Sequence, residues 1–173
     1  VFHDTRIGKD GPSVSDLSLA EIRELMEPAG VQVPTLNEVV AACKTILGLN
    51  IEVKDRGLAA DLLLDSIKMY DPSRVLVSSF MHDYLYDLHR VAPHIPLGLL
   101  MSSRLVDPGV LFASFDAAVL VQHFAFVDTA YVELIRSLDR KLWVWPLENR
   151  DDIRRMVEYG VDVIICDYPD RAV

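Results

Sequence analysis

The segment Leu49-Asn50-Ile51-Glu52-Val53-Lys54 has an apolar body and ends with an acid and a base. Side chains two residues apart on a strand point to the same face, so Glu52 and Lys54 are expected to project together near the carboxyl end of the strand. Charges at such a position are costly unless they pair with each other, with a metal or with a charged ligand. The alternative interpretation is an edge strand that carries an ordinary surface Glu–Lys pair.

Further apolar runs follow this strand and alternate with segments of helical spacing. The runs cover 75–78, 96–101, 117–121, 142–145 and 161–166, and the helical patterns cover 59–70, 82–91, 108–114, 128–138 and 150–159. Short, mostly β-branched runs separated by helices are typical of a parallel α/β sheet rather than a sandwich.

Capping signals mark several helix ends. Ser18-Leu19-Ala20-Glu21 and Thr35-Leu36-Asn37-Glu38 have the spacing of capping boxes, so two helices are expected before the strand at 49–53. Asn149 is expected to cap the last helix, and Gly160 is placed to end it.

Two parallel architectures are compatible with this alternation. A doubly wound sheet normally carries a glycine-rich first turn, and the chain has neither G-x-G-x-x-G nor a P-loop. A (β/α)8 TIM barrel instead carries functional side chains at the carboxyl ends of several strands. Such residues do follow the apolar runs here: Glu52 and Lys54, Ser78-Ser79-Phe80, Gln122-His123, Trp145 and Asp167.

We therefore expect residues 1–173 to form a single parallel TIM-barrel domain that is incomplete at its N-terminus. A complete barrel has eight strands and typically about 250 residues, whereas six β–α units are readable in these 173 residues. We expect the first one or two strands to lie before Val1, in an extension of roughly 40–50 residues at the observed spacing.

Composition limits the possible partners and compartments. The chain is 51% hydrophobic, which suits one domain with a sizeable core, and its net charge of −9 (pI about 4.9) comes with no basic stripe for nucleic acid. Cys43 and Cys166 belong to no CxxC pair, which argues against a thiolate metal site and fits a reducing, cytoplasmic location. No apolar run reaches the roughly 18–20 residues of a membrane span.

An ordered set of short motifs covers essentially the whole chain. In sequence order it contains Val1-Phe2-His3-Asp4, Asp16-Leu17-Ser18-Leu19-Ala20-Glu21-Ile22, Val33-Pro34-Thr35-Leu36-Asn37-Glu38-Val39, Ile51-Glu52-Val53-Lys54, Val77-Ser78-Ser79-Phe80, Val144-Trp145, Gly160-Val161-Asp162 and Asp167-Tyr168-Pro169. In that order the motifs resemble the glycerophosphodiester phosphodiesterase family.

This resemblance implies a TIM barrel that cleaves small glycerophosphodiesters to glycerol 3-phosphate and an alcohol, using a divalent metal ion such as Mg or Ca. His3 then matches a catalytic histidine and Glu52 a metal-binding glutamate. Lys54 matches the basic residue at the substrate phosphate, and Trp145 the tryptophan on the glycerol side of the pocket. His123 is either a further pocket residue that follows a strand or a packed loop histidine.

The implied chemistry requires these residue types. A hard cation held by carboxylates neutralises the charge of a phosphodiester, and a lysine adds a positive charge at the phosphate. A histidine can protonate the departing alkoxide.

The chain departs from the family pattern in several places. The opening His-Arg pair and the Glu-x-Asp metal pair are absent and would lie before Val1. Pro146-Leu147-Glu148 stands where the family usually has Thr, an apolar residue and Asn. Two alternatives therefore stay open: a non-catalytic or truncated member that binds phosphoesters or a protein partner, and a phosphate-handling lyase that forms a cyclic phosphate.

Overall fold

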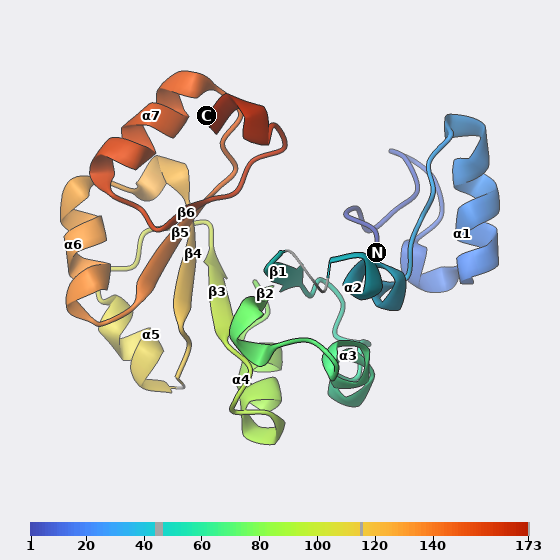
Figure 1. Cartoon of the computed structure of the whole chain (residues 1–173), viewed down its shortest axis with the longest axis horizontal. Coiled ribbons are helices and arrows are strands. Elements are labelled where there is room, and N and C mark those ends of the chain that lie inside the picture. Colours follow the sequence, from blue (N-terminus) through green and yellow to red (C-terminus); the bar gives the residue numbers. More distant parts are fainter. Residues whose placement is uncertain (44–46, 115, 173) are drawn as a thin grey trace. The chain divides into compact units, whose positions relative to one another are not determined.

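The computed structural model describes residues 1–43, 47–114 and 116–172. The chain divides into two compact units, Val1–Leu47 and Gly48–Val173 (Figure 1). The expectation of a single domain over 1–173 stays a prediction.

The first unit contains the two helices that the capping boxes predict, α1 (Leu19–Met26) and α2 (Leu36–Cys43), and two 3-10 turns, Val14–Asp16 and Glu27–Ala29. The hydroxyl of Ser18 accepts a hydrogen bond from the Glu21 amide at 3.3 Å, and the Glu21 carboxylate accepts one from the Ser18 amide at 2.8 Å. Thr35 and Glu38 repeat this exchange at 3.2 and 2.6 Å. The boxes satisfy amide groups that a helix start leaves without partners.

The second unit is a parallel α/β structure. Its sheet has six strands: β1 (Leu49–Glu52), β2 (Val75–Ser79), β3 (Leu97–Met101), β4 (Val119–His123), β5 (Lys141–Trp145) and β6 (Val163–Ile164). All neighbouring strands pair in parallel, in the order in which they occur in the chain.

Helices connect these strands, as the alternating pattern predicts. They are α3 (Ala60–Ile67), α4 (His82–Val91), α5 (Pro108–Ser114), α6 (Thr129–Ser137) and α7 (Arg150–Tyr159), with 3-10 turns at Pro72–Arg74, Phe124–Phe126 and Pro169–Ala172. Asn149 caps α7 by accepting from the Asp152 amide, and Gly160 ends it with a φ of 81°. Among the described residues, every helix is too short or too polar to cross a membrane.

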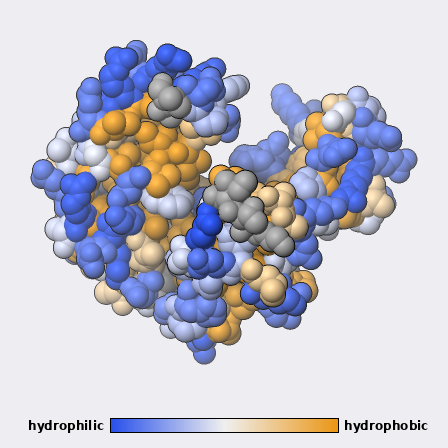
Figure 2. Space-filling model, in the orientation of Figure 1, coloured by the Kyte–Doolittle hydropathy of each residue, from blue (hydrophilic) through white to orange (hydrophobic). Residues whose placement is uncertain are grey.

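The two faces of the sheet carry different side chains. The face that we call the helix face is almost completely buried: α4 packs on β2 and β3, and α6 packs on β5. Its residues include Val77, Leu97, Leu99, Leu120, Leu142 and Val144. The opposite face, which we call the site face, carries an apolar cluster of Leu76, Leu100, Val119 and Val121, against which Trp143, Trp145 and Ile165 pack. Figure 2 shows apolar residues gathered in the middle of this unit and hydrophilic residues over the outer helices α6 and α7.

The sheet is curled toward its site face. Phe80 follows β2 and Trp145 ends β5, three places further along the sheet, yet their ring centroids are 5.4 Å apart. A flat sheet would separate these strands by about 14 Å, because neighbouring strands lie about 4.8 Å apart. The six parallel strands therefore form a curled half-barrel (Figure 1).

A glycine at the centre of the site face permits this close packing. An added Cβ on Gly98 would meet Leu76 Cδ2 and Val121 Cγ2 at 3.0 Å and Ser78 Cβ at 3.2 Å. Side chains from β2 and β4 thus pack over the backbone of β3.

Candidate active site

Glu52 and Lys54 lie together at the carboxyl end of β1, as the strand periodicity predicts. The Lys54 Nζ is 3.6 Å from Glu52 Oε1, and the two side chains are 31% and 30% exposed. Between them, the main chain of Val53 is fixed to β2, because its amide donates to the Ser78 carbonyl at 2.8 Å and its carbonyl accepts from the Ser79 hydroxyl at 2.6 Å. The strand end is therefore held in place while both charged groups stay accessible.

Polar side chains from β1 and β2 lie beside Glu52. Ser78 is opposite Glu52 in the β1–β2 register and is fully buried. Its hydroxyl donates to Asn50 Oδ1 at 2.9 Å. The site face thus changes from apolar to polar next to the carboxylate, which is where a charged ligand would be received.

His123 and Trp145 form a second pair, at the carboxyl ends of β4 and β5. They are opposite each other in the strand register, and their rings meet edge-to-face with centroids 5.1 Å apart. The indole Nε1 of Trp145 donates to the Val121 carbonyl at 3.0 Å. The Nδ1 atom of His123 accepts from the Ala125 amide at 3.3 Å, which leaves the proton of the neutral ring on Nε2.

Aromatic rings surround this second pair. Phe124 stacks on His123 at 5.1 Å, Phe126 tilts against it at 5.8 Å, and Phe80 reaches Trp145 from β2. Phe80 and Phe126 keep 47% and 39% of their surface exposed. The cluster forms an apolar wall suited to the carbon skeleton of a small ligand.

The predicted site residues of the second unit therefore share one edge of the sheet. Glu52 ends β1 and Lys54 follows it, whereas His123 and Trp145 end β4 and β5. Phe80, which follows β2, contacts Trp145. His3 belongs to the first unit, where it is exposed and its Nδ1 is 2.8 Å from Asp4 Oδ1.

Sequence reasoning missed the side chains that connect the loops at this edge. His82, at the start of α4, is half-buried and its Nε2 is 3.0 Å from the Leu100 carbonyl. Arg56, which follows β1, forms an ion pair with Asp83 of α4, and this hydrogen bond lowers the pKa of the Asp83 carboxyl. Partners this far apart in the chain leave no local pattern, so the sequence offered no signal for them.

A divalent metal ion would need several donor atoms that meet at one point. Hard cations take about six to eight oxygen ligands. Within residues 1–43, 47–114 and 116–172, no group of three His, Cys, Asp or Glu side chains gathers at one point. Glu52 is suitable as one ligand, but the described residues do not complete a site around it.

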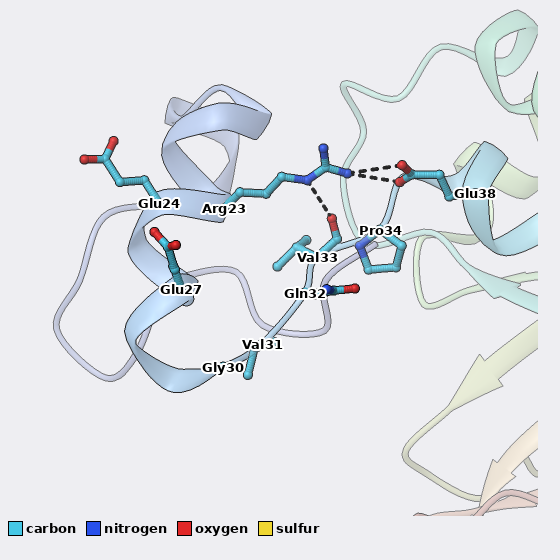
Figure 3. Close-up of a pocket in the computed structure, with 9 residues that line it drawn as sticks. All are labelled: Arg23, Glu24, Glu27, Gly30, Val31, Gln32, Val33, Pro34 and Glu38. Atoms are coloured by element: carbon cyan, nitrogen blue, oxygen red, sulfur yellow. Dashed lines mark hydrogen bonds and ion pairs between the residues drawn. The ribbon is translucent and has the colours of Figure 1, made fainter.

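A separate cavity of about 990 Å³ lies within the first unit (Figure 3). Its lining consists of Arg23, Glu24, Glu27, Gly30, Val31, Gln32, Val33, Pro34 and Glu38. Arg23 donates from Nε to the Val33 carbonyl at 3.1 Å and pairs with Glu38 at 3.0 Å. Hydrogen bonds from the Thr35 amide and hydroxyl and from Arg23 lower the pKa of Glu38. These charges are used to cap and brace α2, and the cavity contains none of the predicted site residues.

Comparison with known proteins gives a consistent result. Residues 1–171 match the model of the glycerophosphoryl diester phosphodiesterase family. A glycerophosphodiester phosphodiesterase of Caldanaerobacter subterraneus subsp. tengcongensis is 32% identical over 191 residues, covering 100% of this chain and 78% of the relative. One from Bacillus altitudinis is 28% identical over 156 residues, covering 85% and 64%.

Solved structures share the fold. An Oleispira antarctica phosphodiesterase, determined in complex with its product sn-glycerol-3-phosphate, superposes with a TM-score of 0.83 at 24% identity, covering 99% of this chain and 76% of that one. The parallel α/β fold, the placement of the predicted site residues at one edge of the sheet and the match over residues 1–171 are consistent with one family. The chain belongs to the glycerophosphodiester phosphodiesterase family of phosphoric diester hydrolases.

Proposed function

We propose that this chain acts in the metal-dependent hydrolysis of small glycerophosphodiesters, with glycerol 3-phosphate and an alcohol as products. The observation that carries the proposal is the placement of an acid–base pair and an aromatic pair at one edge of one parallel sheet. Functional side chains of TIM-barrel enzymes are found at this edge. We further propose that the curled half-barrel is part of a complete (β/α)8 barrel.

Each residue has a role that follows from its chemistry. Lys54 carries an accessible ammonium that can meet the substrate phosphate, and Glu52 supplies one oxygen ligand to a divalent cation such as Mg or Ca. Such a cation, when bound, would neutralise phosphate charge.

The aromatic pair is proposed to receive the glycerol part of the substrate. Trp145 and His123 present an apolar surface for the glycerol carbons, next to polar groups for its hydroxyls. The product bound to the Oleispira antarctica protein supports glycerol 3-phosphate as the phosphate-bearing product here. His3 is proposed to transfer a proton to or from the reacting oxygen.

The test is a single substitution at Glu52. In the full chain, Glu52→Gln keeps the shape but removes the ligand charge. We expect hydrolysis of glycerophosphocholine to fall by about 100-fold or more and to recover in part at high metal concentration. Glu158→Gln, an exposed glutamate on α7, is the matched control and should retain the wild-type rate. Wild-type turnover by Glu52→Gln, with metal still required, would show that Glu52 is an ordinary surface residue.

The incomplete donor set favours a second candidate, a non-catalytic member that binds phosphoesters. Binding of glycerol 3-phosphate without turnover in any divalent metal would support it. Phosphorus NMR of the products separates the hydrolase from a lyase, because the hydrolase gives linear glycerol phosphate and the lyase a cyclic phosphate.

A further inference from the structure

Gln122 is a polar exception on the apolar helix face of the sheet. It lies between Val121 and His123, whose side chains point to the site face, so its own side chain points toward the helices. It is fully buried, whereas the residues opposite it on β3 and β5, Met101 and Val144, are apolar. A buried amide is costly unless its hydrogen bonds are made, so its partners indicate what it is for.

Those partners belong to the loop that follows β3. The Nε2 atom of Gln122 donates to the carbonyls of Met101 and Ser103, at 3.3 and 3.2 Å. One side-chain amide thus holds both carbonyls around Ser102. Its Oε1 accepts from the hydroxyl of Tyr131 at 3.5 Å.

Tyr131 of α6 and Asp128, the N-cap of this helix, also contact the loop that follows β3. Tyr131 is fully buried, and its hydroxyl is hydrogen-bonded by the main chain of Leu105. Arg104 forms a two-pronged ion pair with Asp128, at 2.7 and 3.2 Å, and its guanidinium lies 4.6 Å above the Tyr131 ring. We call Gln122, Tyr131, Arg104 and Asp128 the loop anchor.

The loop anchor holds the main chain on both sides of Ser102. Met101 is opposite Gln122 in the strand register, so Ser102, the first residue after β3, follows the strand at the same edge of the sheet as His123, the last residue of β4. Ser102 and Ser103 form a bend directly after β3, at the carboxyl end of the strand. Ser102 is exposed, which leaves its hydroxyl accessible to a ligand.

We infer that Ser102 is a specificity-determining residue that hydrogen-bonds a hydroxyl of the glycerol group, and that Gln122 and Tyr131 are positioning residues that hold it there. The inference rests on the proposed function, since it assigns a ligand group to the same edge of the sheet. The aromatic surface of His123 and Trp145 contacts the glycerol carbons, and Ser102 supplies the polar contact next to it.

The test compares two adjacent serines on two substrates. Glycerophosphocholine carries a glycerol group, and bis(p-nitrophenyl) phosphate is a phosphodiester without one. Ser102→Ala should raise KM for glycerophosphocholine by on the order of tenfold, with little change in kcat or in the rate on the second substrate. Ser103→Ala, which keeps the main-chain carbonyl bound by Gln122, should match the wild type on both. Equal behaviour of the two variants, or an equal loss on both substrates, overturns the assignment.

The positioning role has its own readout. Tyr131→Phe keeps the buried ring under Arg104 and removes only the hydroxyl, so the variant should fold. Amide hydrogen exchange across 102–105 should accelerate, KM for glycerophosphocholine should rise, and adding Ser102→Ala should raise KM little further. An unchanged rate of amide hydrogen exchange across 102–105 would refute the positioning role. So would effects of Tyr131→Phe and Ser102→Ala on KM that multiply fully in the double variant.

Failure of the proposed function is distinguishable from failure of this inference. If the wild type hydrolyses neither substrate, calorimetry with glycerol 3-phosphate still decides the role of Ser102. A roughly tenfold weaker Kd in Ser102→Ala but not in Ser103→Ala supports it. Equal affinities, or no binding by the wild type, reject it.

Discussion

The curl of the sheet predicts an energetic coupling between Phe80 and Trp145. These residues follow or end strands three places apart, and only a curled sheet brings their rings to 5.4 Å at an interplanar angle of 80°. An edge-to-face aromatic pair contributes about 0.5–1.5 kcal/mol beyond its buried area. A double-mutant cycle of Phe80→Leu and Trp145→Leu should therefore give a coupling free energy of about 1 kcal/mol.

Equilibrium urea unfolding at 25 °C measures the four proteins of this cycle. The single change Trp145→Leu also removes the hydrogen bond from Nε1 to the Val121 carbonyl, which costs about 1 kcal/mol but cancels in the cycle. A second cycle, of Val106→Ala with Trp145→Leu, is the control, because Val106 is fully exposed, and its effects should add. A Phe80–Trp145 coupling below about 0.3 kcal/mol, within ordinary additivity error, would refute the curled arrangement.

Three further predictions follow from other parts of the structure. Gly98→Ala should lower the free energy of unfolding by about 1–3 kcal/mol, because its Cβ would press on Leu76 and Val121, whereas Gly48→Ala meets only the Arg74 carbonyl at 3.4 Å and should cost less in the same urea titration. The hydrogen bond from Arg104 lowers the pKa of Asp128, so its contribution to stability is present above the ordinary aspartate pKa of about 3.9 and is lost as pH falls through the lowered value. Asp128→Asn, which can still cap α6, should lose less stability than the wild type on acidification below about pH 4, and a constant difference across the pH range would contradict this. Lys54→Ala should impair substrate binding and turnover together, whereas His3→Ala should mainly lower kcat. A substrate with a more acidic leaving group should rescue His3→Ala more than Lys54→Ala, and equal rescue of both would contradict the assigned roles.

Hydrophobic periodicity and capping were enough to predict most of the architecture. The alternation of apolar runs and helical patterns gave a parallel sheet, because each run is short and is followed by an amphipathic helix. The predicted ends of strands were less accurate where pairing with a neighbouring strand, rather than local hydrophobicity, decides where the strand ends. The run at 117–121 became the strand Val119–His123, since Gln122 and His123 pair with Val144 and Trp145 of β5.

The candidate site was predictable where its chemistry is local. Glu52 and Lys54 are two residues apart, and strand geometry alone brings them together. The loop anchor was not predictable, because Gln122 lies 19 and 21 residues from the carbonyls that it binds. The contact between Phe80 and Trp145 depends on the curvature of the whole sheet, which no short stretch of sequence encodes.

The sequential strand order has a consequence for how this unit folds. Paired residues on neighbouring strands lie only 20 to 26 residues apart along the chain, and each strand pairs solely with those before and after it within the described sheet. The entropy of closing loops of this length is nearly the same at every step, because it grows only with the logarithm of length. Pairing can therefore proceed strand by strand during synthesis on the ribosome, with each new β–α segment adding to an edge that has already formed.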